Sequence, residues 1–214
     1  MAQHSESWID SSDVISMFPT LVWKLQPKPD LRLKIETNIL ALLQTLRREQ
    51  PSLAPGQGWQ SESSLHQRQE LNDLVSCVNS AAQSVLRFLK IGESAIDITG
   101  CWATVLRKSA EHRIHTHPNN FLSGVYYLRT HQGADTINFH DPRSQAGIIR
   151  PPVMELSAAN TDQVVVNVMN GTLLMFPSYL QHSVAPNMSE EERISISFNL
   201  MFPAFAEKLA KPLW

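Results

Sequence analysis

The sequence predicts a mainly β protein, a sandwich or barrel preceded by N-terminal helices. Two observations support this prediction. From residue 96 onward, short segments rich in β-branched and aromatic residues alternate with Gly, Pro, Asn and Asp, which is typical of sandwiches and barrels rather than of repeated strand–helix–strand units. Before residue 96, apolar residues recur at three- and four-residue spacing, which indicates amphipathic helices.

The chain begins with an extended region followed by a first helix. Residues 14–25 favour an extended conformation broken at Pro19, because proline cannot donate a hydrogen bond to a β-ladder. The apolar spacing over Leu31–Glu49 predicts a helix. Polar residues, prolines and glycines over Pro51–Ser64 predict a loop after it.

A second helix is predicted over Gln67–Leu89, and Gly92 is predicted to end it. Its core-facing residues are predicted to be Leu71, Leu74, Val75, Val78, Ala81, Ala82, Val85 and Leu89. The apolar stripes of both helices suit either packing against the β core or a homodimer interface. We predict packing against the core, and the oligomeric state stays open.

The β-rich part contains a series of predicted strands. They are Ile96–Leu106, Leu122–Leu128, Thr136–Phe139, Val164–Val168, Thr172–Phe176, His182–Ala185 and Ile194–Met201. We therefore expect residues 1–95 to form extended segments and bracing helices, and residues 96–214 to form the core that carries the chemistry. Both parts are expected to make one compact unit.

Composition excludes several classes of protein. The 18 Lys+Arg and 20 Asp+Glu give a net charge of −2 without a basic cluster, so no nucleic-acid surface is expected. The N-terminus lacks a secretory signal, and no apolar run approaches the roughly 20 residues that span a bilayer, so no membrane association is expected. Cys77 and Cys101 suit a reducing compartment, which predicts a cytoplasmic location.

Three histidines have the spacing of a metal site. His115 and His117 precede an apolar strand, and residues two apart in a strand face the same side. His182 follows a strand that ends at Pro177, and it suits a third ligand from a neighbouring strand. Neutral imidazoles bind divalent iron, manganese or zinc, and three protein ligands leave open positions on the ion.

Several histidines also have a structural interpretation. A His-X-His pair alone occurs in many surface loops, and only the later His182, with Arg193 and Ser195 behind it, favours a metal site. His112 is expected to be solvated in a polar turn. His140-Asp-Pro-Arg143 is expected to be an Asp-Pro turn that closes a strand, with a place at the rim of a pocket as the alternative.

With these residues in view, the sequence resembles the iron(II)- and 2-oxoglutarate-dependent oxygenases. More narrowly, it is similar to the 2OG-Fe(II) oxygenase family with an HxHP…SGVYYL segment, a DPR turn and a C-terminal H…RxSxSFN strand. The corresponding segments here are His115-Thr-His117-Pro118, Ser123–Leu128, Asp141-Pro-Arg143, and His182 with Arg193–Asn199. The resemblance covers about residues 96–202 strongly and the N-terminal helices loosely.

The resemblance implies a double-stranded β-helix, also called a jelly roll, that holds Fe(II) with 2-oxoglutarate and O2 as cosubstrates. His115 and His182 are the implied metal ligands, and Arg193 with Ser195 binds the C5 carboxylate of 2-oxoglutarate. Arginine suits this role because its planar fork pairs with a carboxylate through two hydrogen bonds. Only one of Tyr126 and Tyr127 can face the same side, and the resemblance favours Tyr127.

His117 departs from the pattern of the superfamily, in which an aspartate or glutamate stands at this position. One interpretation makes His117 the third ligand of a three-histidine site. The other leaves two protein ligands, as in oxygenases that resemble aspartyl β-hydroxylases, whose HxGPxN segment is similar to residues 115–120 with matching Pro118 and Asn120. We favour His117 as a ligand.

The implied reaction is hydroxylation of an unactivated C–H bond, with release of succinate and CO2. A small molecule or a peptide is the expected substrate. The residues considered for the substrate pocket are Trp102, Tyr179, His140 and Arg143. Trp102 has an ordinary core position as its alternative.

Two other classes of protein share parts of the pattern. A cupin-type metal enzyme fits the spacing Gly171-x5-Pro177-x4-His182, but it needs a glutamate where this chain has Phe121 or Leu122. A jelly roll that binds a metal or ligand without catalysis would bind iron and show no turnover. Arg193 and Ser195 favour the 2-oxoglutarate-dependent enzyme over both.

Overall fold

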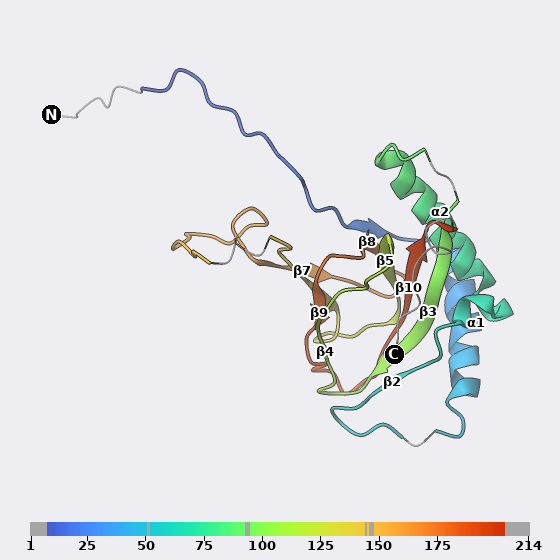
Figure 1. The fold of residues 1–214 in the computed structure, drawn as a ribbon. Coiled ribbons are helices and arrows are strands. Elements are labelled where there is room, and N and C mark those ends of the chain that lie inside the picture. Colours follow the sequence, from blue (N-terminus) through green and yellow to red (C-terminus); the bar gives the residue numbers. More distant parts are fainter. Residues whose placement is uncertain (1–7, 51, 93–94, 144, 146–147, 204–214) are drawn as a thin grey trace.

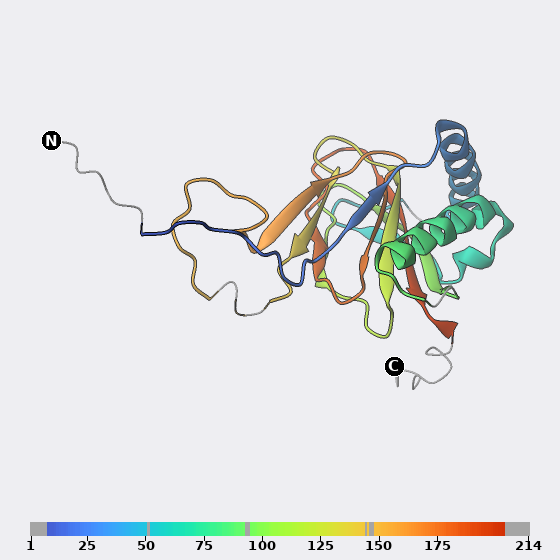
Figure 2. The same ribbon diagram turned by 90° about the horizontal axis from the view of Figure 1, so that it is seen from above.

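In the computed structural model, two β-sheets face each other and two helices cover the outer face of the larger sheet (Figures 1 and 2). The structure describes residues 8–50, 52–92, 95–143, 145 and 148–203. The helices are α1 (Pro29–Leu46) and α2 (Asn72–Phe88). The strands are β1 (Trp23–Leu25), β2 (Gly58–Gln60), β3 (Asp97–Leu106), β4 (His112–His115), β5 (Leu122–Arg129), β6 (Thr136–His140), β7 (Gln163–Asn167), β8 (Leu173–Pro177), β9 (His182–Val184) and β10 (Arg193–Met201).

The larger sheet has the order β1-β8-β5-β10-β3-β2, and the smaller sheet has the order β4-β9-β6-β7. Every pairing between these labelled strands is antiparallel. From β3 to β6 and from β7 to β10, consecutive strands alternate between the two sheets, as in a double-stranded β-helix, whereas β6 and β7 are neighbours in the smaller sheet. The predicted fold class is therefore confirmed.

Each face of the larger sheet packs against a different layer. Toward the helices, Tyr126, Ile196 and Phe198 are buried in one cluster with Ile39 of α1 and Val85 of α2. Toward the smaller sheet, a second cluster fills the space between the sheets; it contains Tyr127, Ile137, Phe139, Val168, Leu174, Phe176 and Leu180. Alternation along each strand divides the side chains between these layers. The apolar stripes of both helices thus pack against the β core.

The second helix differs from the prediction at both ends. It begins at Asn72, because two short 3-10 turns, Leu65–Gln67 and Gln69–Leu71, precede it. Leu86 is buried in place of the predicted Leu89, which is 38% exposed. Gly92 does not end the helix: Lys90 takes the left-handed conformation (φ 54°). The Ile91 N–H donates a hydrogen bond to the Leu86 carbonyl, which satisfies a carbonyl of the last turn.

The strands predicted from residue 96 onward are confirmed within a few residues at their ends. In the N-terminal part, the predicted loop 51–64 contains strand β2, which pairs with β3. Of the predicted extended region 14–25, only Trp23–Leu25 pairs in a sheet, with β8. Both N-terminal strands belong to the larger sheet, and β2 brings Gln60 beside Thr104.

Three further predictions concern the N-terminal residues, the membrane and the cysteines. Residues 1–7, on which the absence of a secretory signal is predicted, lie outside the described residues. In the described part of the chain, neither helix combines the length and the apolar character that crossing a bilayer requires. Cys77 and Cys101 are free thiols, and burial raises the pKa of Cys101 to about 12.

Candidate functional site

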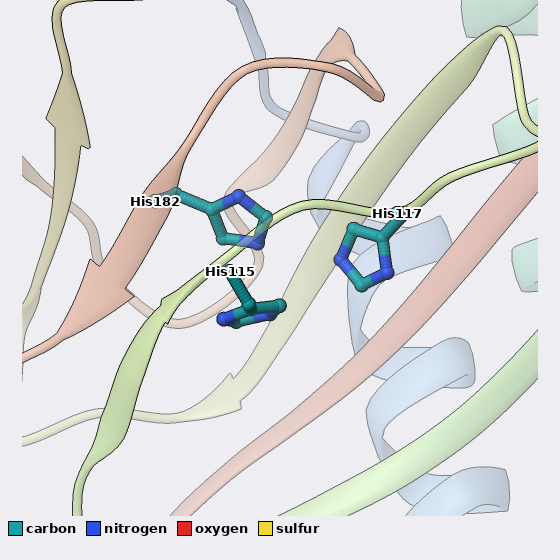
Figure 3. A group of neighbouring side chains, drawn as sticks. All are labelled: His115, His117 and His182. Carbon is teal, nitrogen blue, oxygen red and sulfur yellow. The ribbon is translucent and has the colours of Figure 1, made fainter.

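The three predicted imidazoles converge at one end of the space between the sheets. His115 ends β4 and His182 begins β9, and the two residues are paired directly across these strands. His117 lies two residues beyond the end of β4, where its backbone N–H donates to the Ser178 carbonyl at 3.0 Å. One ligand nitrogen from each ring lies within 4.8 Å of the others, and Figure 3 shows the rings turned toward one another.

The position of His117 differs from the prediction. His115 and His117 were expected to share a face because they lie two apart in one strand, yet the strand ends at His115. The bridge from His117 to Ser178 holds the chain after β4 beside the turn that precedes His182. The convergence therefore depends on this backbone contact as well as on alternation along a strand.

Backbone carbonyls orient the rings of His115 and His182. The Nδ1 atom of His115 lies 2.8 Å from the carbonyl oxygen of Arg113, and Nδ1 of His182 lies 2.9 Å from that of Leu180. A carbonyl oxygen only accepts, so Nδ1 carries the hydrogen in each ring and Nε2 keeps its lone pair. Metal-binding histidines commonly have this arrangement.

Burial keeps two of these imidazoles, His117 and His182, neutral near pH 7. It lowers the pKa of His117 to about 4, with a further contribution from His115. Burial also lowers the pKa of His182 to about 4, although its bond to Leu180 acts in the opposite direction. Metal binding requires the unprotonated imidazole, so His117 and His182 need not lose a proton at neutral pH to bind an ion.

The imidazoles open into a cavity of about 230 Å³ between the sheets. Its lining consists of Gln60, Trp102, Thr104, His112, His115, His117, Val125, Tyr127, Ile137, His182, Val184, Arg193, Ser195 and Ser197. The larger sheet contributes aligned residues to its floor: Ser195 pairs with Thr104 on one side and with Tyr127 on the other. Thr104, Ser195 and Tyr127 thus place hydroxyl-bearing side chains on three neighbouring strands, and Ser195 lies close to Arg193 in the sequence of β10.

Arg193 is a buried cation without an acidic partner in the part of the chain that the structure describes. It is 4% exposed, and its Nη2 donates to the Thr136 carbonyl at 3.3 Å. Its Cζ lies 5.2 Å from the centre of the Tyr127 ring. Burial lowers the pKa of Arg193, while Tyr127 and Asp135 act in the opposite direction. A buried charge is costly unless it is paired, so this site suits an anion.

Unpartnered polar atoms surround this cation. Among the described residues, Nε of Arg193, the hydroxyl of Tyr127 and the hydroxyl of Thr104 are buried without hydrogen-bond partners. Buried polar groups in proteins are nearly always satisfied, and a group of exceptions indicates a missing ion, water or ligand. All three residues line the cavity, so the donors fit a carboxylate that enters it.

The two tyrosines of the predicted carboxylate pocket lie on opposite faces of β5. Tyr127 lines the cavity with Arg193. Tyr126 belongs to the cluster beneath the helices. The structure thus places Tyr127, which the resemblance favours, on the side of the metal group.

The four residues considered for the substrate pocket lie in different surroundings. Trp102 lines the cavity, with its ring centre 5.8 Å from that of His117. Tyr179 is 62% exposed in the turn before His182. His140 shares a 2.9 Å hydrogen bond with Ser183, and exposed Arg143 pairs with Asp141. The last three are not part of the described cavity lining, and residues 141–143 follow directly after the end of β6, as expected of a segment that closes a strand.

His112 was wrongly expected to be a solvated residue in a turn. It lies in β4, lines the cavity, and burial lowers its pKa to about 4. Gln60 and Thr104 also line the cavity although the sequence did not indicate them. The polar residues around His112 pointed to a turn, and nothing in that local pattern revealed the strand pairing with β9.

Comparisons with known proteins agree with this fold and site. Residues 100–199 match the family described as "Putative 2OG-Fe(II) oxygenase". A search of curated proteins gives no significant match. The chain is similar in structure to a prolyl hydroxylase from Trichoplax adhaerens in complex with a hypoxia inducible factor peptide fragment, with 15% identity, coverage of 89% of this chain and 87% of that chain, and a TM-score of 0.60.

Two further solved structures were determined with cosubstrate bound. The epimerase SnoN, in complex with Fe3+, alpha ketoglutarate and nogalamycin RO, has 14% identity, a TM-score of 0.62, and coverage of 91% of this chain and 89% of that chain. HygX from Streptomyces hygroscopicus, with nickel and 2-oxoglutarate, has 10% identity, a TM-score of 0.57, and coverage of 86% and 83%. The match to the 2OG-Fe(II) oxygenase family over residues 100–199 thus contains all three converging histidines and Arg193.

Proposed function

We propose that this protein is an Fe(II)- and 2-oxoglutarate-dependent dioxygenase that hydroxylates an unactivated C–H bond of a small molecule or peptide. The observation that carries the proposal is a single cavity that joins a three-histidine group to a buried arginine without an acidic partner in the described chain. One half of this cavity suits a divalent metal, and the other half suits a carboxylate.

His115, His117 and His182 are the proposed metal ligands. The backbone carbonyls of Arg113 and Leu180 fix which nitrogen of His115 and His182 faces the ion. When bound, iron(II) supplies the activation of O2 that is coupled to decarboxylation of 2-oxoglutarate. Three protein ligands leave open positions for this chemistry.

Arg193, Ser195 and Tyr127 are the proposed binding residues for the C5 carboxylate of 2-oxoglutarate. The guanidinium neutralises the carboxylate and receives it in a planar fork. Tyr127 and Ser195 are paired across neighbouring strands, and their hydroxyls are further donors. Burial of Arg193 strengthens this interaction, because water does not screen the charges in a closed cavity.

Trp102 is the proposed wall of the substrate pocket. It lies on the cavity side of β3 beside His117, where a substrate must approach the metal. Tyr179, His140 and Arg143 stay proposals for contacts at the entrance, since they lie outside the described cavity lining. Structural neighbours include a hydroxylase that binds a peptide and an epimerase that binds a small molecule, which supports both substrate classes.

Binding of the metal and cosubstrate tests this proposal without knowledge of the substrate. Anaerobic addition of 2-oxoglutarate to the Fe(II)-loaded protein is expected to produce a weak visible charge-transfer band. The band should be absent in His182→Ala, and it should need much more 2-oxoglutarate in Arg193→Met. A protein that binds iron but gives no band at saturating 2-oxoglutarate would contradict the proposal, as would an unchanged band in His182→Ala.

A further inference from the structure

His112 is a fourth imidazole of the cavity, and the three-histidine metal group does not include it. Its ring centre lies 6.1 Å from that of His115, and both residues line the cavity. Its ligand atoms are not among those that converge within 4.8 Å. This histidine therefore has a position inside the site without a role in the proposed metal coordination.

A β-bulge brings His112 into the cavity. In a regular strand, residues three apart face opposite sides of the sheet. Here His112 pairs with Val184 and His115 pairs with His182, so β4 has one more residue than β9 between the two pairs. The extra residue turns both imidazoles toward the same side, and bulges near active sites commonly re-aim a side chain in this way.

His112 lines the same cavity as Arg193, Tyr127 and Ser195, the residues proposed to bind the carboxylate. Its ring is next to that of His115, and it shares the cavity with Arg193, so it has access to both the metal group and the carboxylate site. A carboxylate has about four lone-pair positions, and a guanidinium fork uses two of them. Further donors are needed for the others, and an imidazole N–H supplies one.

We propose that His112 donates a hydrogen bond to the C5 carboxylate of 2-oxoglutarate that Arg193 holds, so that it is a further cosubstrate-binding residue. This inference rests on the proposed function. It concerns a residue of the bulged strand β4, and it predicts that loss of the imidazole weakens cosubstrate binding without weakening metal binding.

Calorimetric titration of the anaerobic Fe(II)-loaded protein with 2-oxoglutarate tests the inference directly. His112→Phe keeps a ring of similar size and removes the donor, and it is expected to raise the dissociation constant of 2-oxoglutarate about tenfold, the effect of losing a hydrogen bond to a charged group. His112→Gln restores an N–H donor and is expected to recover most of the affinity. Fe(II) affinity, measured separately, should stay within about twofold in both variants.

Pyruvate serves as the second probe, because it shares the metal-chelating 2-oxo acid group and lacks the distal carboxylate. Its affinity is expected to be the same in wild type and His112→Phe. His131→Phe, a histidine substitution outside the described cavity lining, is the matched control and should bind both acids as wild type does.

The outcomes separate this inference from the proposed function. Equal 2-oxoglutarate affinity in wild type and His112→Phe overturns the inference alone. A parallel loss of Fe(II) or pyruvate affinity also overturns it, because His112 would then act at the metal end. If the iron-loaded wild type does not bind 2-oxoglutarate, the proposed function fails together with it.

Discussion

The guanidinium carbon of Arg193 lies 5.2 Å from the ring centre of Tyr127, inside the cavity that receives His115, His117 and His182. The cation is buried and its Nε has no hydrogen-bond partner among the described residues. Proteins rarely retain such a group unless it has a function, because removing a charge from water costs several kcal/mol. Binding of a carboxylate next to this pair is therefore expected to stabilise the fold.

Arg193→Met should separate stability from function. Without 2-oxoglutarate, we expect the variant to be as stable as wild type or more stable by about 1–2 kcal/mol, because an unpaired buried charge is replaced by an apolar chain of similar length. With Fe(II) and 2-oxoglutarate, wild type should gain thermal stability and the variant should not. Thermal unfolding with and without the ligands measures both effects. A variant that is strongly destabilised without ligands would contradict this account.

Substitutions of His117 should show whether it binds the metal. We expect His117→Ala to lower Fe(II) affinity about 100-fold, since each ligand of a protein metal site contributes several kcal/mol. His117→Asp supplies a carboxylate at the same position and should retain affinity within about tenfold. Competition with a coloured chelator gives the affinities, and His131→Ala is the control. Wild-type affinity in His117→Ala would instead indicate a two-histidine site.

Two strand glycines should respond differently to alanine. A Cβ atom at Gly124 would lie 2.5 Å from the Leu174 carbonyl oxygen and would also overlap the Phe198 ring. We expect Gly124→Ala to lower the free energy of unfolding by about 2–3 kcal/mol through overpacking. At Gly100 the nearest atom to such a Cβ, outside the adjacent residues, would be Trp102 Cζ3 at 3.6 Å, an ordinary contact. Gly100→Ala should therefore change stability by less than about 0.5 kcal/mol in the same denaturation experiment.

An ion pair between Arg47, directly after α1, and Glu192, directly before β10, should make stability depend on pH. The two terminal guanidinium nitrogens of Arg47, Nη1 and Nη2, each donate to the Glu192 carboxylate at 2.8 Å, and these bonds hold the pKa of Glu192 below its ordinary value. A lowered carboxyl pKa stabilises the fold above the unfolded-state pKa, and the contribution is lost as the pH falls through the folded-state pKa.

Glu192→Gln measures this contribution. We expect it to cost about 1 kcal/mol at pH 7, with the difference from wild type disappearing in acid. Glu190→Gln, at the exposed partner of Lys108, is the control and should have little effect on the pH profile. A difference for Glu192→Gln that persists unchanged at acidic pH would show that the ion pair is not its cause.

The fold was largely predictable because the pattern of side chains changes where the structure changes. Strands such as β5 and β10 have alternating residues that face the helices or the cavity, and both helices carry apolar stripes. Strand β2 was missed because three residues, Gly58–Gln60, are too few to show a period. Gly92 was the expected helix end, although Lys90 takes the left-handed conformation.

The site was predictable where its residues follow regular geometry or a family motif. His115, His182, Arg193 and Tyr127 are of this kind, and the structure brings them to one cavity. His112 was missed because its direction depends on a bulge, and a bulge is set by pairing with β9, which is distant in the sequence. His117 lies beyond the strand end, so its approach depends on the Ser178 carbonyl rather than on alternation.

The most direct test of the central proposal is succinate formation from 2-oxoglutarate by the purified protein, with Fe(II) and O2 and with candidate small-molecule and peptide substrates. We predict succinate that appears only with both Fe(II) and O2, and that falls at least about 100-fold in His182→Ala. Absence of succinate with every substrate class, or equal formation by His182→Ala, would contradict the account.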